Sequence, residues 1–359
     1  MRDKKKIVIG MSGGVDSSVA AYLLKKEGYE VIGVTLDHNE DKTLKLEIDG
    51  AKEICNFLGI KHIVVDIQEI FKKEVIENFL DGYSNGITPS PCVVCDERVK
   101  LKTLFQIADK KKAGYVATGH YCSVKYLDEF ESYLLKISIN KRKDQSYMLY
   151  RLDRDKIERL KFPLYNYEKV EIREIAKKIG LKVHDKGDSQ GICFAKNGYI
   201  DFLRKNLGNK IKKGRFLDEN GKVLGEHEGY QLYTIGQRRG LGLKLPKPYF
   251  ILEIKKESNE IILGDYEKLY KKEVKLLEFK SPIELNRLIG KKLIGRPRFS
   301  SFGNLGEIKI RDGEIFFEFD ESTPQLASGQ HLVLYYKDFV LGGGIIETWQ
   351  VLIKGIYYN

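Results

Sequence analysis

The chain of 359 residues contains no run of eighteen apolar residues, so no segment is long enough to cross a membrane as a helix. Its first residues, Met1 to Lys6, are basic but lead directly into an apolar strand, without the apolar region or cleavage site of a secretory signal. Internal repeats and low-complexity segments are also missing. We therefore expect a cytoplasmic protein with no membrane partner, and the length favours two or three domains.

Cysteine is sparse, and in a cytosolic chain five residues argue against a structural disulfide framework. The five are Cys55, Cys92, Cys95, Cys122 and Cys193. A structural zinc site is disfavoured because it would need a second closely spaced pair of Cys or His, which this sequence lacks. Cys55 falls on a helix face with Ile54 and Leu58, so we expect it to be buried and inert, and Cys122 could be the same.

Acidic residues are outnumbered, with 62 Lys and Arg against 51 Asp and Glu, a net charge of +11 and a pI near 9.1. This excess favours a polyanionic partner such as a nucleic acid. A Lys-rich genomic composition would produce the same balance, so charge alone leaves both interpretations open.

The most informative segment is residues 7 to 18, where an apolar strand runs through Ser-Gly-Gly-x-Asp-Ser into a helix predicted over Asp16–Lys26. Gly13 and Gly14 let the backbone approach a phosphate closely, and the free N–H groups and positive end of the helix dipole would face it. No Gly-Lys-Ser/Thr follows, which excludes a Walker A loop, and Gly-x-Gly-x-x-Gly is missing too. An ordinary turn would need neither the strand before nor the helix after. The segment predicts a pyrophosphate-binding loop.

This loop resembles the signature of the PP-loop ATP pyrophosphatases, which cleave ATP between its α and β phosphates. The resemblance implies ATP and Mg²⁺ as cofactors, with Asp16 near the magnesium and the pyrophosphate. The residues that it implies for ATP binding are Gly10, Met11, Ser12, Gly13, Gly14, Val15, Asp16, Ser17, Leu36 and Gly119.

Up to about residue 200, apolar strands alternate with helical stretches, which predicts an α/β fold with a doubly wound parallel sheet. The predicted strands are Lys6–Ile9, Glu30–Val34, His62–Val65 and Tyr115–Thr118. After a helix over Tyr199–Leu207 comes a hairpin-like pair, Phe250–Lys255 and Glu260–Leu263. Alternating strands then dominate and predict a small β-barrel. We expect a catalytic domain at 1–200, a small central domain at 201–275 and the barrel at 276–359.

The proline-stiffened segment Thr88–Cys95 precedes an amphipathic helix, so we expect Cys95 at the helix N-terminus. There the dipole, with Arg98 and Lys100 nearby, should lower the thiol pKa and favour the nucleophilic thiolate. Cys193 lies in a polar loop that contains glycine. The two cysteines are therefore candidates for a reactive pair.

Several further motifs, in order along nearly the whole chain, resemble the bacterial tRNA-specific 2-thiouridylases, the MnmA family. They are Thr118–Tyr121, Lys143–Tyr147, Gly191–Phe194, Gly225–Gly229, Tyr233–Arg238, Gly240–Gly242 and Leu341–Ile346. The resemblance implies that ATP activates the C2 oxygen of the wobble uridine in tRNAs for Lys, Glu and Gln. A persulfide on Cys193, loaded by a cysteine desulfurase or a sulfur-relay protein, would deliver sulfur. Cys95 would then resolve it as a disulfide or release sulfide.

The same resemblance implies which residues contact the tRNA, with the barrel taking part. They are Ser90, Pro91, Cys92, His120, Lys143, Asp144, Gln145, Arg298, Phe299 and Gln330. Lys and Arg meet phosphates, and Phe299 offers a face to an unstacked base. From the residues alone, His120 could instead be a hydrogen-bonded histidine at a strand end, and Phe299 a core residue of the barrel.

One position departs from the family pattern, because Cys92 stands where many members carry Asp, and a thiol cannot replace a carboxylate base. Cys92, Cys95 and Cys193 could together hold a [4Fe-4S] cluster, which would replace the persulfide route. A non-catalytic tRNA-binding protein is the alternative from another class. Other PP-loop enzymes, such as amidating synthetases, would not need the paired cysteines.

Overall fold

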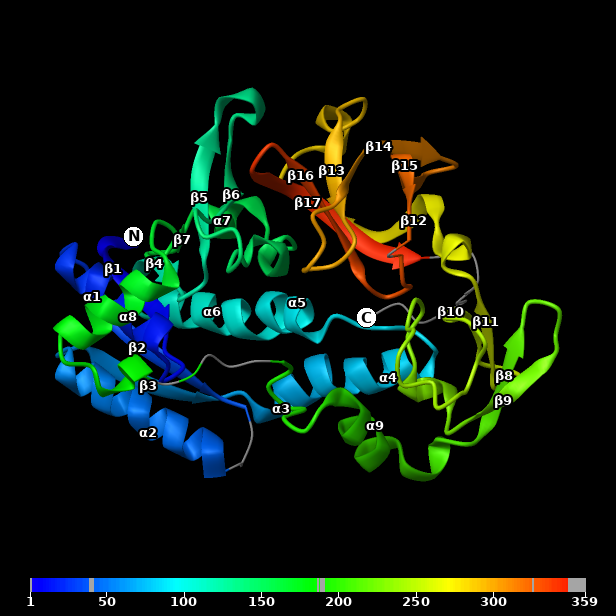
Figure 1. Cartoon of the computed structure of the whole chain (residues 1–359). Helices are drawn as coiled ribbons and strands as arrows, with labels where there is room; N and C mark the ends of the chain where they lie inside the picture. The colour runs from blue at the N-terminus through cyan, green and yellow to red at the C-terminus, as the bar shows by residue number, and fades with distance from the viewer. Residues whose placement is uncertain (1, 39–41, 186, 188–190, 325, 348–359) are drawn as a thin grey trace.

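The computed structural model describes residues 2–38, 42–185, 187, 191–324 and 326–347. The predicted segment around Cys193 is therefore described only from residue 191 onward, and residues 348–359 of the predicted barrel domain lie outside the described part. Figure 1 shows three regions: a parallel sheet with helices at the left, a barrel at the upper right and a smaller sheet at the lower right.

The first region is a five-stranded parallel sheet in the order β3-β2-β1-β4-β7. Its strands are β1 (Asp3–Gly10), β2 (Glu30–Asp37), β3 (Lys61–Asp66), β4 (Ala113–Ala117) and β7 (Leu160–Lys161). One face packs against α1 (Val15–Lys26), α2 (Lys42–Phe57) and α8 (Lys169–Lys178), and the other against α6 (Lys102–Lys110). The predicted doubly wound sheet is confirmed. Strand order reverses between β1 and β4, where such sheets bind ligands.

Two helical segments lead from this sheet toward the other regions (Figure 1). The first comprises α3 (Gln68–Phe71), the π-helical η1 (Lys72–Glu77) and α4 (Asn78–Ser84). The second comprises α5 (Pro91–Cys95), the π-helical η2 (Asp96–Leu101) and α6. The amphipathic pattern predicts the second helix, but not its π-helical turn, which changes the spacing of side chains locally.

The central region is a four-stranded sheet in the order β10-β11-β8-β9, packed against α9 (Tyr199–Leu207). Its strands are β8 (Gly214–Asp218), β9 (Val223–His227), β10 (Phe250–Lys255) and β11 (Glu260–Gly264). The predicted helix and hairpin are both present, and Asn259 takes a left-handed conformation at the hairpin turn, with φ of 53°.

The last region is an antiparallel barrel in the order β12-β15-β14-β13-β16-β17, which closes by pairing β12 with β17. Its strands are β12 (Lys271–Lys280), β13 (Leu293–Arg296), β14 (Asn304–Arg311), β15 (Glu314–Thr323), β16 (His331–Tyr336) and β17 (Phe339–Glu347). The predicted β-barrel is confirmed. The domain boundaries at 200 and 275 stay predictions.

A hairpin from the first region extends the barrel sheet, an arrangement that the sequence does not predict. It consists of β5 (Cys122–Leu127) and β6 (Ser132–Ile137), and β6 pairs with β17 at Lys136 and Phe339. The hairpin follows β4 directly, so the switch point of the parallel sheet is tied to the barrel (Figure 1).

Short helices complete the described chain. They are α7 (Arg154–Ile157), η3 (Asp128–Phe130), η4 (Ser146–Leu149), η5 (Lys182–Asp185), η6 (Gly208–Lys210), η7 (Tyr230–Leu232), η8 (Tyr266–Leu269) and η9 (Leu285–Arg287). Among the described residues, no helix combines the length and the apolar character that a membrane crossing requires.

Candidate active site

The loop between β1 and α1 has the geometry of an anion cradle. Gly13 has a φ of +68°, and a Cβ there would lie 2.5 Å from the carbonyl oxygen of Glu47 in α2, so only glycine fits. Gly14 precedes α1, which begins at Val15, one residue before the predicted start. The Ser12 N–H donates to Ser17 Oγ at 3.2 Å, which closes the loop around the helix N-terminus. The first N–H groups of α1 face the space in front of the loop.

Gly119 follows β4 and lies against this same loop. A Cβ at Gly119 would be 2.9 Å from the backbone nitrogen of Ser17 and 3.1 Å from the carbonyl carbon of Asp16. Any larger residue would push the β4 end away from the start of α1. Leu36, near the end of β2, the neighbour of β1, is partly buried. The structure thus brings the separate candidates for ATP binding to the switch point of the sheet.

Asp16 is fixed by two residues for which the sequence gives no role. The Lys169 Nζ donates to both carboxylate oxygens at 2.7 Å, and the Tyr121 hydroxyl donates to one of them at 2.8 Å. Lys169 is the first residue of α8, whose start is marked by a capping box of Glu168 and Glu171. That box predicts a helix start, but no local signal tells which strand end the lysine faces.

ATP and Mg²⁺ fit this donor set. The glycine loop and the helix N-terminus suit a pyrophosphate, and Mg²⁺ commonly uses one or two carboxylates while keeping waters and phosphate oxygens as its other ligands. Asp16 can supply such a carboxylate. Among the described residues no group of three His, Cys, Asp or Glu side chains is arranged to hold a metal ion, so the protein supplies no complete metal cage there.

Cys95 does not lie at a helix N-terminus, so this prediction is wrong. The helix begins at Pro91, and Cys95 is the last residue of α5, where η2 takes over. Its residue surface is only 6% exposed, and burial raises the pKa of its thiol to about 12. The predicted lowering of the pKa is therefore also wrong, because desolvation outweighs the nearby cationic Lys100.

An ion pair between the exposed Lys100 and the buried Asp96 lies beside Cys95. The Lys100 Nζ is 3.0 Å from Asp96 Oδ1, and the His120 Nε2 is 3.6 Å from Asp96 Oδ2. Burial would raise the pKa of Asp96, but Lys100 and His120 outweigh it and lower that pKa to about 2. In the π-helical turn Lys100 follows Cys95 by five residues, the spacing that such a turn brings into line.

The charge of Lys100 acts on three thiols. Burial raises the pKa of Cys92, of Cys95 and of Cys193, and in each case the cationic Lys100 counteracts that rise. Cys193 is exposed as a residue, and its neighbour Phe194 packs edge-on against Phe71 and Phe79 of the first helical segment. The segment that carries Cys193 is thereby held close to the helix of Cys92 and Cys95.

The five cysteines are free thiols, so the structure contains no disulfide between Cys95 and Cys193. Cys55 and Cys122 are fully buried, as expected. Burial raises the pKa of Cys55 to about 11, and it also raises that of Cys122. Both are chemically inert at neutral pH.

Several predicted tRNA contacts are engaged within the protein. Asp144 is buried and accepts hydrogen bonds from the N–H groups of Ser138 and Ser146 at 3.0 and 3.4 Å. Gln145 accepts one from the Tyr121 N–H at 3.0 Å. Of the three consecutive residues Lys143, Asp144 and Gln145, only Lys143 is exposed.

Gln330 and His120 also have protein partners. The Gln330 Nε2 donates to the carbonyl oxygens of Thr88 and Pro89 at 2.9 and 3.4 Å, so this barrel residue holds the segment that leads to Ser90, Pro91 and Cys92. His120 Nδ1 lies 2.8 Å from the Thr118 hydroxyl, as expected of a hydrogen-bonded histidine at a strand end. His120 also contacts Asp96, and this contact joins the end of β4 to the cysteine helix.

Arg298 and Phe299 lie in the loop after β13. Phe299 is 45% exposed and packs edge-on against Tyr147 at a ring distance of 6.1 Å, so it is not a core residue of the barrel. The Arg298 Nη2 donates to the Ile235 carbonyl at 3.4 Å. Its guanidinium thus links the barrel to the central region.

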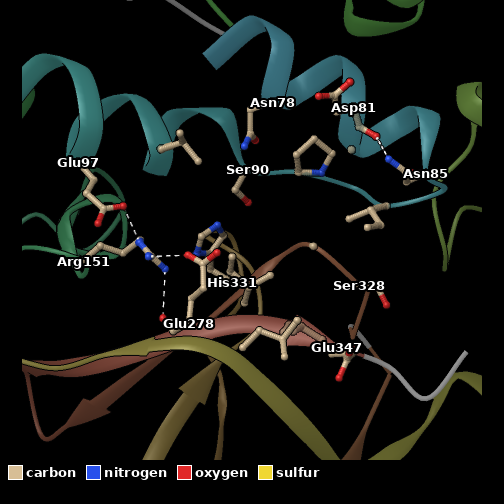
Figure 2. A pocket seen from close by; sticks show the side chains of 18 of the residues that line it. Asn78, Asp81, Asn85, Ser90, Glu97, Arg151, Glu278, Ser328, His331 and Glu347 are labelled. Carbon is tan, nitrogen blue, oxygen red and sulfur yellow. Dashed lines mark hydrogen bonds and ion pairs between the residues drawn. The ribbon is translucent and has the colours of Figure 1, made fainter. Parts of the chain in front are cut away.

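A cavity separates the cysteine helix from the barrel, and Figure 2 shows its polar lining. Arg151, which is 4% exposed, donates to Glu97 at 2.6 Å and to Glu278 of β12 at 2.9 Å. Ser90 lies at the same cavity. Sequence reasoning missed Arg151, because its partners are distant in the chain. The adjacent residues Asp96 and Glu97 therefore connect the cysteine helix to His120 after β4 and, through Arg151, to the barrel.

Comparisons with known proteins cover nearly the whole chain. Three family profiles match: a tRNA methyl transferase HUP domain at residues 5–197, a tRNA methyl transferase PRC-barrel domain at 200–265 and an aminomethyltransferase beta-barrel domain at 303–346. A tRNA-specific 2-thiouridylase MnmA from Fusobacterium nucleatum is 55% identical over 96% of this chain and 100% of its own length. One from Clostridioides difficile is 40% identical over 96% of this chain and 98% of its own.

Solved structures resemble parts of the chain. The U34-tRNA thiolase NcsA from Methanococcus maripaludis with its [4Fe-4S] cluster has a TM-score of 0.36 and 20% identity, covering 57% of this chain and 67% of that one. NMN synthetase from Francisella tularensis has a TM-score of 0.33 and 18% identity, covering 58% of this chain and 87% of that one.

Proposed function

The chain belongs to the tRNA-specific 2-thiouridylase (MnmA) family, and from this premise we propose that it catalyses the ATP-dependent 2-thiolation of the wobble uridine in tRNAs for Lys, Glu and Gln. One observation carries the proposal. Gly119 packs against the phosphate loop, and the next residue, His120, contacts Asp96 beside Cys95. Two successive residues therefore connect the phosphate loop to the cysteine helix, which supports a reaction in which activation is followed by sulfur transfer.

The phosphate side binds and orients the nucleotide. With Mg²⁺, ATP supplies the adenylyl group that turns the C2 oxygen of uracil into a leaving group. The N–H groups of the Ser12–Gly14 loop and the N-terminus of α1 would hold the pyrophosphate, and Asp16, oriented by Lys169 and Tyr121, would supply a carboxylate to Mg²⁺.

The thiol side carries the sulfur. The terminal sulfur of a Cys193 persulfide attacks C2, the C–O bond breaks and AMP leaves. The Cys95 thiolate then attacks Cys193 Sγ, and the electron pair of the broken S–S bond passes to the sulfur on C2. The products are 2-thiouridine and a Cys95–Cys193 disulfide, which a dithiol reductant returns to thiols. The exposure of Cys193 supports its loading by a cysteine desulfurase or a sulfur-relay protein.

A second candidate is the same reaction on a [4Fe-4S] cluster held by Cys92, Cys95 and Cys193, because Cys92 and Cys193 both act electrostatically on the Cys95 thiol and raise its pKa. The persulfide route is preferred because the described residues form no metal-binding group. A non-catalytic tRNA-binding protein would have no use for an intact phosphate loop beside reactive cysteines.

The test is anaerobic purification with an ultraviolet-visible spectrum and iron analysis, followed by single-turnover thiolation of unmodified tRNA with and without reductant. We expect no stoichiometric iron, and one AMP and one pyrophosphate for each 2-thiouridine. The Cys92→Ser variant should stay near normal. Iron bound in cluster proportion, with activity lost in Cys92→Ser, would select the cluster route, and ATP-independent or missing thiolation would contradict the proposal.

A further inference from the structure

We propose that Lys169 exchanges partners when the nucleotide binds: its ammonium group leaves the Asp16 carboxylate, binds a phosphate oxygen of ATP and so frees Asp16 for Mg²⁺. The inference deepens the proposed function and rests on it, because it takes ATP as the ligand of the phosphate loop. It assigns a phosphate-binding residue outside that loop, on a helix 153 residues further along the chain.

The phosphate loop, residues 10–18, has no cation of its own. It contains no lysine or arginine, and its one charged residue is Asp16. A Walker A loop, in contrast, carries a lysine that pairs with the phosphates. Because the carboxylate of Asp16 repels a bound phosphate, a cation from another part of the chain is needed to offset its charge.

Helix α8 brings such a cation to the loop. Lys169 is the first residue of α8, and its Nζ donates to both carboxylate oxygens of Asp16 at 2.7 Å. Ile172 of α8 packs in one buried cluster with Val19 and Ala20 of α1, so the two helices are fixed against each other (Figure 1). The ammonium group therefore lies at the first turn of α1, whose N–H groups face the proposed phosphate position.

The two donors on Asp16 differ in their freedom to move. Tyr121 is 3% exposed and its backbone N–H donates to Gln145 Oε1, so its hydroxyl, 2.8 Å from Asp16 Oδ1, is fixed. Lys169 reaches Asp16 with a long flexible side chain, which is 14% exposed, and the side chain of Asp16 is 33% exposed. Because an ion pair that water reaches adds little stability, the ammonium group can be exchanged at small cost, while Tyr121 keeps Asp16 oriented.

These contacts leave little room for a metal ion on Asp16. The ammonium group donates to both oxygens and the Tyr121 hydroxyl to one of them, so three of the roughly four lone-pair sites of the carboxylate are used. Mg²⁺ there would also lie next to the positive charge of Lys169. The metal and Lys169 therefore compete for Asp16, whereas Lys169 and phosphate attract each other. Binding of ATP ends the competition, because the phosphate draws Lys169 away from Asp16.

The exchange has a signature that a purely structural lysine lacks. If Lys169 only held Asp16 in place, its removal would weaken the binding of both ATP and the metal ion. In the exchange, Lys169→Met removes a phosphate ligand but also frees the carboxylate of Asp16. Binding of ATP without metal should then weaken, while binding of a metal ion to the nucleotide-free protein should strengthen. The two effects have opposite signs.

The experiment uses the full chain without tRNA. Isothermal titration calorimetry measures ATP binding in excess EDTA, and electron paramagnetic resonance of the free ion measures Mn²⁺ binding without nucleotide, since Mn²⁺ takes the same oxygen ligands as Mg²⁺. For Lys169→Met we expect ATP to bind at least about tenfold more weakly, the effect of losing one hydrogen bond between charged groups. Mn²⁺ should bind about fivefold more tightly, because the competing cation is gone. Lys169→Arg keeps the charge and should resemble the wild type in both measurements.

The matched control is Lys177→Met, which removes the same charge from an exposed lysine in the last turn of α8 and should bind ATP and Mn²⁺ like the wild type. Weaker binding of both ligands in Lys169→Met would give Lys169 a structural role alone and overturn the exchange, as would unchanged binding of both or an equal effect in the control. Binding of ATP that depends on Lys169 in an enzyme unable to thiolate tRNA would refute the proposed function alone. No binding of ATP by the wild type would refute both.

Discussion

The two sides of the candidate active site, here called the nucleotide wall and the thiol wall, are built by different physics. On the nucleotide wall, the proposed binding groups are backbone N–H groups whose positions are set by glycine conformation and close packing at Gly13 and Gly119. On the thiol wall, reactivity depends on side-chain pKa values, and burial raises that of Cys95 to about 12. The first wall is thus formed before substrate arrives, whereas the second holds its thiol protonated. We infer that sulfur transfer is the step on which charge near the cysteines acts.

The largest expected effect separates the two walls. Cys193→Ser removes the atom that carries the persulfide, so 2-thiouridine formation should fall below detection, while ATP cleavage to AMP with bound tRNA continues. Parallel assays of AMP and of 2-thiouridine in hydrolysed tRNA measure both. Cys55→Ala, a small change at a buried thiol that has no role in the proposed sulfur transfer, is the control and should keep both activities. Loss of AMP formation in Cys193→Ser would contradict the division between the walls.

A smaller effect is expected on the nucleotide wall. Gly119→Ala places a methyl group 2.9 Å from the Ser17 nitrogen, so the β4 end must move away from the phosphate loop. Misplacement by about 1 Å can cost about 100-fold in rate, and we expect AMP formation to fall by that order. Gly50→Ala in α2 is the control, since a Cβ there meets nothing within 4 Å. Unchanged kinetics in Gly119→Ala, with the fold intact by circular dichroism, would refute the packing argument.

A change on the thiol wall tests the role of charge. Lys100→Met removes the cation that lowers the thiol pKa values, so single-turnover sulfur transfer should slow about tenfold, the effect of roughly one pKa unit, while AMP formation persists. Lys100→Arg should restore most of the rate. When the rate of Cys193 alkylation is measured against pH, the midpoint of the curve should lie at higher pH in Lys100→Met than in the wild type. The control is Lys102→Met, an exposed lysine two residues on. If Lys100→Arg slowed sulfur transfer as much as Lys100→Met, the positive charge at residue 100 would not be what controls the rate.

The sequence predicts what is local and misses what is assembled over distance. The start of α1, the α9 helix and the hairpin turn at Asn259 follow from glycine placement and periodicity within short windows. The contact of Lys169 with Asp16 joins residues far apart in the chain, and no pattern in either segment encodes it. The predicted low pKa of Cys95 is wrong for a related reason, because that pKa depends on burial by other segments and not on its own helix.

The smallest effect concerns the stability that Asp96 gives the thiol wall. Its pKa of about 2 lies below the unfolded value of about 3.9, so its contribution is present above about pH 4 and lost as pH falls toward 2. Between pH 5 and pH 3, the wild type should lose about 1 kcal/mol more unfolding free energy in urea than Asp96→Asn, which cannot ionise. Glu228→Gln, at an exposed ion pair, should follow the wild type. Equal pH dependence in wild type and Asp96→Asn would mean that Lys100 and His120 do not hold this carboxylate charged, and the electrostatic account of the thiol wall would fail with it.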